Sequence, residues 1–280
     1  MRHGPLATTG ALLIAAGLMA APKEATPQRT AGKGTAPAVR TDPTSGLELV
    51  RLAAGTFHFG CEPGDGDCSG DERPGRRVDV GSMWIGKTEA TVHAYARCVA
   101  DGACTEPNVG GACNWAARDR DDHPVNCVDW DQATRFCQHM GGRLPTAEEW
   151  EYAAKGGESR IYPWGNDAPT DRRANFADAQ YKKKYPRSFD IPGQDDGWIE
   201  SAPVGTFPEG ATKQGLLDMA GNVIEWTSSE YEPGQMEARG GGWATDTVSR
   251  RLRASYRTGR ARSYWHATFG FRCAIPVTGS

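Results

Sequence analysis

Residues 142–157 read GRLPTAEEWEYAAKGG, and this stretch carries the clearest structural signal in the chain. Thr146 stands three residues before Glu149, which is the spacing of a capping box at the start of a helix. Gly156 and Gly157 follow, and glycine readily adopts the left-handed backbone conformation in which helices end. The stretch therefore predicts a short helix that begins after Thr146 and stops before Gly156.

Two more helices are predicted on the N-terminal side of this stretch. One spans residues 91–99 and stops at an Asp-Gly pair. The other begins after Asp129, with Gln132 at the capping-box spacing, and stops at the glycines 141–142. We expect both helices to be short.

The remaining segments predict short strands and long loops. GLELVRLAAGTFHFG (46–60) indicates two strands broken at Gly55, and VDVGSMWIGKTEAT (78–91) indicates another extended segment. After residue 157 the chain is rich in the Gly, Pro, Asn and Asp residues that are typical of turns. The spacing is too irregular for a doubly wound sheet. The predicted fold class is α+β, with few helices, short strands and long loops.

The composition of the chain excludes several classes of protein. The chain has 280 residues, of which 35 are glycine and 9 are tryptophan, and hydrophobic residues make up 38%. It lacks the long aliphatic stripes of a helical bundle, so we expect a largely aromatic core. The formal charge is 32 − 35 = −3, which gives no overall attraction to nucleic acid. The basic run 182–184, flanked by tyrosines, is interpreted as a solvated loop.

The N-terminal region has the pattern of an export signal followed by a linker. Residues 11–20 read ALLIAAGLMA, an apolar run that suits a signal-peptide core and is too short to span a bilayer. We predict a signal peptide over 1–21, a disordered Pro/Thr/Ala-rich linker over 22–45, and one folded domain over 46–278. The protein is then secreted or periplasmic, without a membrane span.

An ordered series of motifs runs through the predicted domain. It includes GTFHFG (55–60), HPVNCVDW (123–130), the 142–157 stretch, GLLDMAGNVIEWT (215–227), RGGGW (239–243) and GFRC (270–273). The series resembles the sulfatase-modifying factor family, whose best-known members are formylglycine-generating enzymes, and it covers about residues 47–277. The resemblance implies a compact mixed fold related to C-type lectin-like folds.

Eight cysteines permit 105 pairings, and the sequence alone does not choose among them. The spacing favours three close pairs, Cys61–Cys68, Cys98–Cys104 and Cys113–Cys127, which leaves Cys137 with Cys273. The last pair matches the disulfide that the family resemblance places between a helix and the GFRC segment. The alternative, buried free thiols, fits an exported protein less well.

The family resemblance also implies two calcium sites. Calcium takes six to eight oxygen ligands from irregular loops. The first set is the Asn175 and Asp196 side chains with the Phe176 and Trp198 carbonyls. The second set is the Asp218 and Glu225 side chains with the Gly221 and Val223 carbonyls. The alternative is that these polar groups only cap turns. Calcium is the cofactor that we expect.

The catalytic residues of the formylglycine-generating enzymes are not matched in this chain. Those enzymes carry two copper-binding cysteines after R-G-G-S-W, and soft thiolates are the ligands that hold copper(I). Here the segment reads RGGGWATDTVSRR, so the first cysteine position is Thr245 and the second is Arg250, or Ser249 with one gap. We therefore assign no catalytic residue and do not expect copper.

A basic segment follows those two positions. Arginines 250, 251, 253, 257, 260 and 262 fall within thirteen residues, followed by Tyr264, Trp265 and His266. Arg253 and Arg257 match arginines of the family and are interpreted as internal ion pairs. The guanidinium group binds carboxylate, phosphate or sulfate in a bidentate manner. The predicted ligand-binding residues are Trp243, Thr245, Arg250, Arg251 and Trp265.

Three functional hypotheses remain from the sequence. The first is an exported, calcium- and disulfide-stabilised member of the family that is not an oxidase, a pseudoenzyme that binds a peptide, glycan or anionic ligand. The second is an oxidoreductase of the formylglycine-generating type that acts on a protein cysteine or another substrate. The third is a lectin-like binding protein diversified by a retroelement.

Overall fold

The computed structural model describes residues 1, 4, 37–245 and 249–277. Residues 37–245 and 249–277 belong to one compact unit. Apart from residues 1 and 4, the predicted signal peptide lies outside the described residues. Residues 22–36 of the predicted linker lie outside them too. Among the helices that are described, none has the length and apolar character needed to cross a bilayer.

Two four-stranded sheets and one hairpin form the β-structure. The first sheet is antiparallel, in the order β1 (Val39–Thr41), β2 (Glu48–Leu52), β5 (Met83–Gly86) and β10 (Ala274–Pro276). The hairpin pairs β3 (Gly55–Phe59) with β4 (Arg76–Val80). The second sheet has the order β8 (Arg257–Ala261), β7 (Gln235–Arg239), β6 (Ile224–Glu232) and β9 (Phe269–Gly270), in which only β9 runs parallel to its neighbour.

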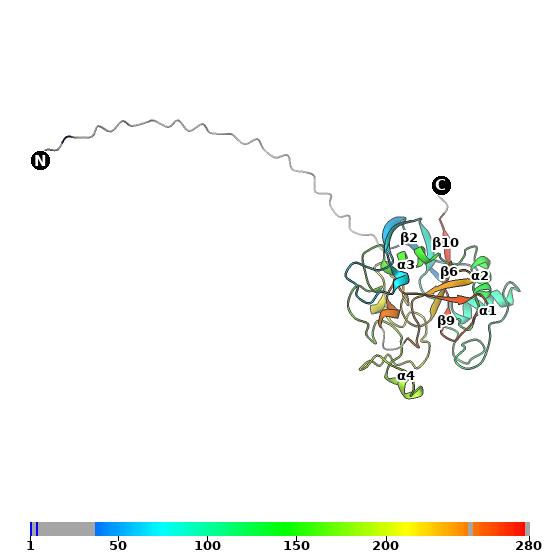
Figure 1. Cartoon of the computed structure of the whole chain (residues 1–280). Coiled ribbons are helices and arrows are strands. Elements are labelled where there is room, and N and C mark those ends of the chain that lie inside the picture. Colours follow the sequence, from blue (N-terminus) through cyan, green and yellow to red (C-terminus); the bar gives the residue numbers. More distant parts are fainter. Residues whose placement is uncertain (2–3, 5–36, 246–248, 278–280) are drawn as a thin grey trace. The chain divides into compact units, whose positions relative to one another are not determined.

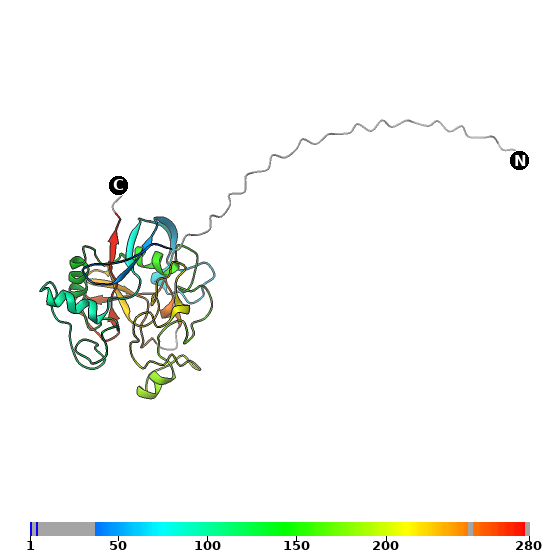
Figure 2. The same cartoon turned by 180° about the vertical axis from the view of Figure 1, so that it is seen from behind.

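The three predicted helices are confirmed together with their caps. They are α1 (Val92–Ala100), α2 (Trp130–His139) and α3 (Ala147–Lys155), and capping boxes form at Asp129 and Thr146. Short 3-10 segments are η1 (Gly70–Glu72), η2 (Pro208–Gly210) and η3 (Ser249–Leu252). Figures 1 and 2 show α1 and α2 together at one edge of the domain, with β6 and β9 near its centre. The α+β fold class with few helices is thus confirmed.

Three boundaries differ from the prediction. Val39–Thr41 forms β1, so the folded part begins before the predicted linker ends; this strand is exposed and exists because it pairs with β2. Gly55 begins β3 rather than separating two strands, and a Cβ there would lie 2.6 Å from the Tyr152 hydroxyl. The basic run 182–184, interpreted as a solvated loop, belongs to the helix α4 (Ala179–Lys184), which is capped by Asp178. It lies at the end of the domain away from β10 (Figures 1 and 2).

The core is largely aromatic, as the composition predicts. Tyr95 stacks on Phe136 with ring centroids 5.5 Å apart, and Phe271 meets both rings edge-on. Trp226 packs against Phe269 with centroids 5.0 Å apart. These rings join α1 and α2 to the second sheet, because an aromatic side chain buries a large apolar area from few positions.

Buried ion pairs connect the loops to this core. Arg253 binds Glu72 and Asp65 at 2.7 and 2.9 Å, and Arg257 pairs with Glu237. The predicted internal ion pairs of Arg253 and Arg257 are therefore confirmed.

All four predicted disulfides are present. The pairs are Cys61–Cys68, Cys98–Cys104, Cys113–Cys127 and Cys137–Cys273, and no described cysteine is free. The last pair closes a sequence separation of 136 residues and ties α2 to the segment before β10.

We expect the long disulfide to stabilise the domain more than a short one. In the chain-entropy model, losing the 136-residue closure in Cys137→Ala/Cys273→Ala costs about 5 kcal/mol of unfolding free energy. Losing the 6-residue closure in Cys98→Ala/Cys104→Ala costs about 2 kcal/mol. Urea unfolding of the two variants measures the difference. Equal losses would contradict the entropic account.

Candidate functional site

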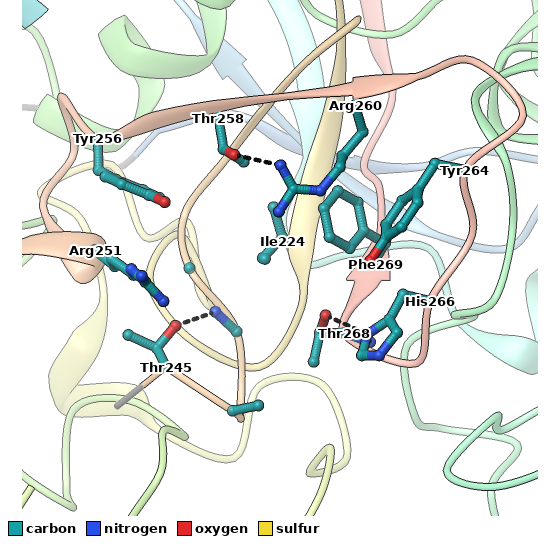
Figure 3. A pocket seen from close by; sticks show the side chains of 13 residues that line it. Ile224, Thr245, Arg251, Tyr256, Thr258, Arg260, Tyr264, His266, Thr268 and Phe269 are labelled. Carbon is teal, nitrogen blue, oxygen red and sulfur yellow. Dashed lines mark hydrogen bonds between the residues drawn. The ribbon is translucent and has the colours of Figure 1, made fainter. Parts of the chain in front are cut away.

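A cavity of about 260 Å³ opens beside the end of β7, and we call it the arginine hollow. Its walls come from the loop after β7, from η3 and β8, and from the loop that leads into β9 (Figure 3). Its lining residues are Ile224, Gly241, Gly242, Ala244, Thr245, Arg251, Tyr256, Thr258, Arg260, Tyr264, His266, Thr268 and Phe269.

The floor of the arginine hollow is a tight turn after β7. Gly240 and Gly241 both have positive φ, 92° and 68°. A Cβ on Gly241 would lie 2.7 Å from the Arg251 carbonyl, so glycine is required for η3 to pack against the turn. The Thr245 hydroxyl then accepts a hydrogen bond from the Gly242 amide at 2.9 Å and closes the turn.

The charged groups of the arginine hollow are basic. None of its described lining residues is Asp or Glu. Arg260 donates to the Thr258 hydroxyl at 3.0 Å and to the Gly259 carbonyl at 2.7 Å, and it lies over the Tyr264 ring. Arg251 faces the same space from η3 (Figure 3). The hollow therefore has the electrostatics of an anion site.

His266 lies at the edge of the hollow as a neutral donor. Burial, and secondarily the Arg260 charge, lower the pKa of its imidazole. The Thr268 amide donates to Nδ1 at 3.2 Å, so the proton of the neutral ring is on Nε2. At neutral pH this ring can donate one hydrogen bond to a ligand.

A second cavity of about 390 Å³ adjoins the first, and we call it the aromatic hollow. Ala244 and His266 line both cavities. The other lining residues of the aromatic hollow are Gly110, Gly111, Ala112, Cys113, Tyr181, Tyr185, Trp243, Trp265 and Ala267. Its aromatic rings come from α4 and its C-terminal end, from the turn after β7 and from the loop before β9.

The structure brings together four of the five predicted ligand-binding residues. Thr245 and Arg251 line the arginine hollow, and Trp243 and Trp265 line the aromatic hollow. Arg250 is exposed and lines neither cavity.

The sequence did not single out several residues that line these cavities. Arg260 and Tyr256 belong to the basic segment, but nothing local showed that they face the same space as Arg251. Tyr181 and Tyr185 flank the lysine run that was interpreted as a solvated loop. The cap at Asp178, whose carboxylate accepts from the Tyr181 amide at 2.9 Å, was a signal for α4.

The residues at the copper positions of the family do not fit copper. Thr245 offers a hydroxyl that is already bonded to Gly242, and Arg250 offers a cation. All eight cysteines form disulfides. Within the described part of the chain, no three or more His, Cys, Asp or Glu side chains lie close enough to hold a metal. We derive no copper chemistry for this site.

The first predicted calcium set combines a carboxylate held by backbone amides with a buried side-chain oxygen that has no described partner. The Asp196 carboxylate accepts from the Phe176 and Trp198 amides at 3.0 and 2.8 Å. The Asn175 side-chain oxygen is buried and has no hydrogen-bond partner among the described residues. Burial, with the charges of Asp178 and Asp195, raises the pKa of Asp196 to about 7. Among the described residues, neither the Asn175 oxygen nor the Asp196 carboxylate has a cationic partner.

In the second predicted calcium set, an arginine already occupies the side of the carboxylate that a cation would bind. Arg272 binds both Glu225 oxygens at 2.7 Å, and the Trp150 indole donates to one of them at 2.7 Å. Asp218 accepts from the Gly205 amide at 2.6 Å. Because the Glu225 charge is already neutralised, a cation there would compete with Arg272.

Comparison with known families assigns the chain to one of them. The model of the "Sulfatase-modifying factor enzyme 1-like domain" matches residues 35–277. The chain therefore belongs to the sulfatase-modifying factor family.

Two characterised relatives and one solved structure are similar to the chain. An "Inactive C-alpha-formylglycine-generating enzyme 2" from Bos taurus is 36% identical over 56% of this chain and 52% of its own length. A formylglycine-generating enzyme from Streptomyces coelicolor is 30% identical over 89% of this chain and 95% of its own length. PvdO from Pseudomonas aeruginosa has the same fold, with a TM-score of 0.71, 22% identity, and coverage of 87% and 100%. The match to the bovine relative spans about half of that protein.

We expect Thr245 to stabilise the turn below the arginine hollow. Thr245→Val keeps the shape of the side chain but leaves the buried Gly242 amide without its acceptor, which costs about 1–3 kcal/mol of unfolding free energy. Thr245→Ser keeps the hydroxyl and serves as the matched control. Chemical denaturation compares the two, and equal stabilities would show that the hydroxyl does not hold the turn.

Proposed function

We propose that this chain is an exported member of the sulfatase-modifying factor family that binds a ligand and does not oxidise cysteine. The observation that carries the proposal is the set of residues that line the arginine hollow and the aromatic hollow, which together we call the cleft. Thr245 occupies the first cysteine position, its hydroxyl is bonded within the turn, and no free thiol lines either hollow. Arg251 and Arg260 give the cleft the charge of a binding site for an anion.

Two further observations support this proposal. The four disulfides are typical of an oxidising compartment, which agrees with export by the predicted signal peptide. The bovine relative, matched over 164 residues, is itself named as inactive.

The other candidate function is a formylglycine-generating oxidoreductase. The Streptomyces enzyme of that name aligns with nearly the whole domain, which favours this function on overall similarity alone. The absence of a thiol pair in the cleft argues against it, because a hydroxyl and a guanidinium do not replace two thiolates as copper(I) ligands.

We expect no formylglycine from the purified domain. The assay incubates it with copper, oxygen, reductant and a peptide containing Cys-x-Pro-x-Arg, and mass spectrometry detects the aldehyde. A formylglycine-generating enzyme with its cysteine pair is the positive control. Multiple turnovers by this domain, lost on Thr245→Ala or Arg251→Ala, would overturn the proposal.

We further propose that calcium binds the first predicted set, Asn175, Asp196, Phe176 and Trp198. When bound, calcium would neutralise the Asp196 carboxylate and give the Asn175 oxygen a partner. The second set, with Glu225 held by Arg272, is not part of this proposal.

We expect calcium to stabilise the domain more at pH 8 than at pH 6. The pKa of Asp196 is about 7 in the folded domain and lower in the unfolded chain. Without calcium its contribution to stability is therefore present below about pH 4 and is lost as the pH rises through 7. Calcium replaces the proton, and at a hundred times its Kd it contributes about 2.7 kcal/mol.

Thermal unfolding of chelator-treated protein, with and without millimolar calcium, measures this effect. Asp196→Asn should remove most of the Tm shift, whereas the exposed neighbour Asp195→Asn should keep most of it. A shift that is the same at both pH values, or unchanged in Asp196→Asn, would argue against this site.

A further inference from the structure

Arg251 and Arg260 in the arginine hollow have no carboxylate partner among the residues that the structure describes. Arg251 is half-buried and makes no hydrogen bond or ion pair with a described residue. Within the described part of the chain, Arg260 bonds to a hydroxyl and a carbonyl and not to a carboxylate. By contrast, the fully buried guanidiniums each pair with a carboxylate: Arg239 with Glu151, Arg253 with Glu72, Arg272 with Glu225. Two guanidinium groups that face one space favour an anionic ligand between them.

The neutral polar groups around these charges are an imidazole, which donates a hydrogen bond, and rotatable hydroxyls, which can donate or accept one. The Tyr256 and Tyr264 hydroxyls make no hydrogen bond with a described residue, and Figure 3 shows that of Tyr256 turned toward the open space of the hollow. His266 adds its Nε2 proton. Such a lining matches a ligand whose surface is dense in oxygen atoms.

The adjoining aromatic hollow offers flat apolar faces beside this polar lining. Trp265 is 44% exposed, which is unusual for so large an apolar side chain in this domain. The Trp243 indole is fixed by a 3.0 Å hydrogen bond to the Ala267 carbonyl, and Tyr181 packs edge-on against it with centroids 5.9 Å apart. Trp243 is held in place but is only 5% exposed, so the exposed Trp265 ring is the surface against which the apolar face of a ligand ring can pack.

We propose that the two adjoining hollows bind an acidic saccharide, with the carboxylate or sulfate between Arg251 and Arg260 and a sugar ring against Trp265. This inference rests on the proposed function and names its ligand class. A saccharide has hydroxyls that both donate and accept, so it can use the tyrosine hydroxyls and the imidazole without leaving a polar group unpaired.

An acidic peptide fits the same charges less well. Each of its residues brings a backbone N–H, which needs an acceptor once it is buried. The described lining of the arginine hollow contains no carboxylate, and its Thr245 hydroxyl already accepts from Gly242. The Tyr256 and Tyr264 hydroxyls can accept, but a backbone N–H can only donate to them, whereas a sugar hydroxyl can donate or accept. The geometry therefore favours the saccharide.

Titration calorimetry on the full folded domain tests the proposal with defined probes. D-glucuronate and D-glucose 6-sulfate carry the two acidic groups, D-glucose lacks a charge, and acetate lacks the ring. We expect at least one acidic sugar to bind at least tenfold more tightly than both glucose and acetate. Which acidic sugar binds more tightly distinguishes a carboxylate site from a sulfate site.

Matched variants locate the binding. Arg260→Gln and Trp265→Ala should each weaken the Kd of the acidic sugar at least tenfold, while Arg250→Gln, at an exposed arginine outside both hollows, should leave it within twofold. Arg260→Lys keeps the charge and should recover part of the affinity. Tm values of the variants show whether each remains folded.

Three outcomes would overturn the proposal. They are equal binding of glucose and the acidic sugars, equal weakening by Arg250→Gln and Arg260→Gln, or preference for an acidic peptide over the sugars. The last result would leave the non-oxidase function standing with a different ligand. Aldehyde formation in the peptide assay would instead overturn that function, so the two failures are distinguishable.

Discussion

The rest of the structure depends on the buried carboxylate of Glu151. It accepts from the Gly60 amide at 2.6 Å, from Lys155 at 2.8 Å and from Arg239 at 2.8 Å. In this way one turn of α3 holds the end of β3 and the end of β7. Burying these charges is costly, and the geometry repays that cost only while every partner is present; removing one partner typically costs about 3–5 kcal/mol. A domain with short strands and few helices needs such connections, because backbone ladders do not reach its loops.

The helices and caps that depend on residues close together in the chain were predicted well from the sequence. The caps at Asp129 and Thr146 need partners three residues away, so the pattern alone located α2 and α3. The strand β1 escaped prediction because its three residues are exposed and polar at two positions, and only pairing with β2 makes them a strand. The Glu151 cluster escaped it too, since Arg239 lies 88 residues away and no local pattern joins the two.

The residues of the candidate site also differ in this respect, because some are placed by a local segment and others by contacts between distant segments. Thr245 and Trp243 follow directly from the RGGGW segment, which fixes their place in the turn. Arg260 enters the arginine hollow because β8 pairs with β7 at a particular register, opposite Met236, and alternate side chains of a strand face opposite sides. Whether Arg250 or Arg251 enters depends on the direction of η3. The arginine composition of the segment could therefore be recognised, but not the pair that faces inward.

The ion pairs that stabilise the turn after β7 are separate from the two arginines of the arginine hollow. Arg239 anchors the turn through Glu151 and Glu237, whereas the arginine hollow begins at Gly241, beyond that anchor. The Thr245 hydroxyl closes the turn with a single hydrogen bond, so no thiol is needed to hold its shape. Among the described residues, no ion pair or disulfide involves Arg251 or Arg260. Arg251 and Arg260 are thus free to be selected for what they bind, whereas Thr245 and Cys113, which also line the hollows, are constrained by the turn and by a disulfide.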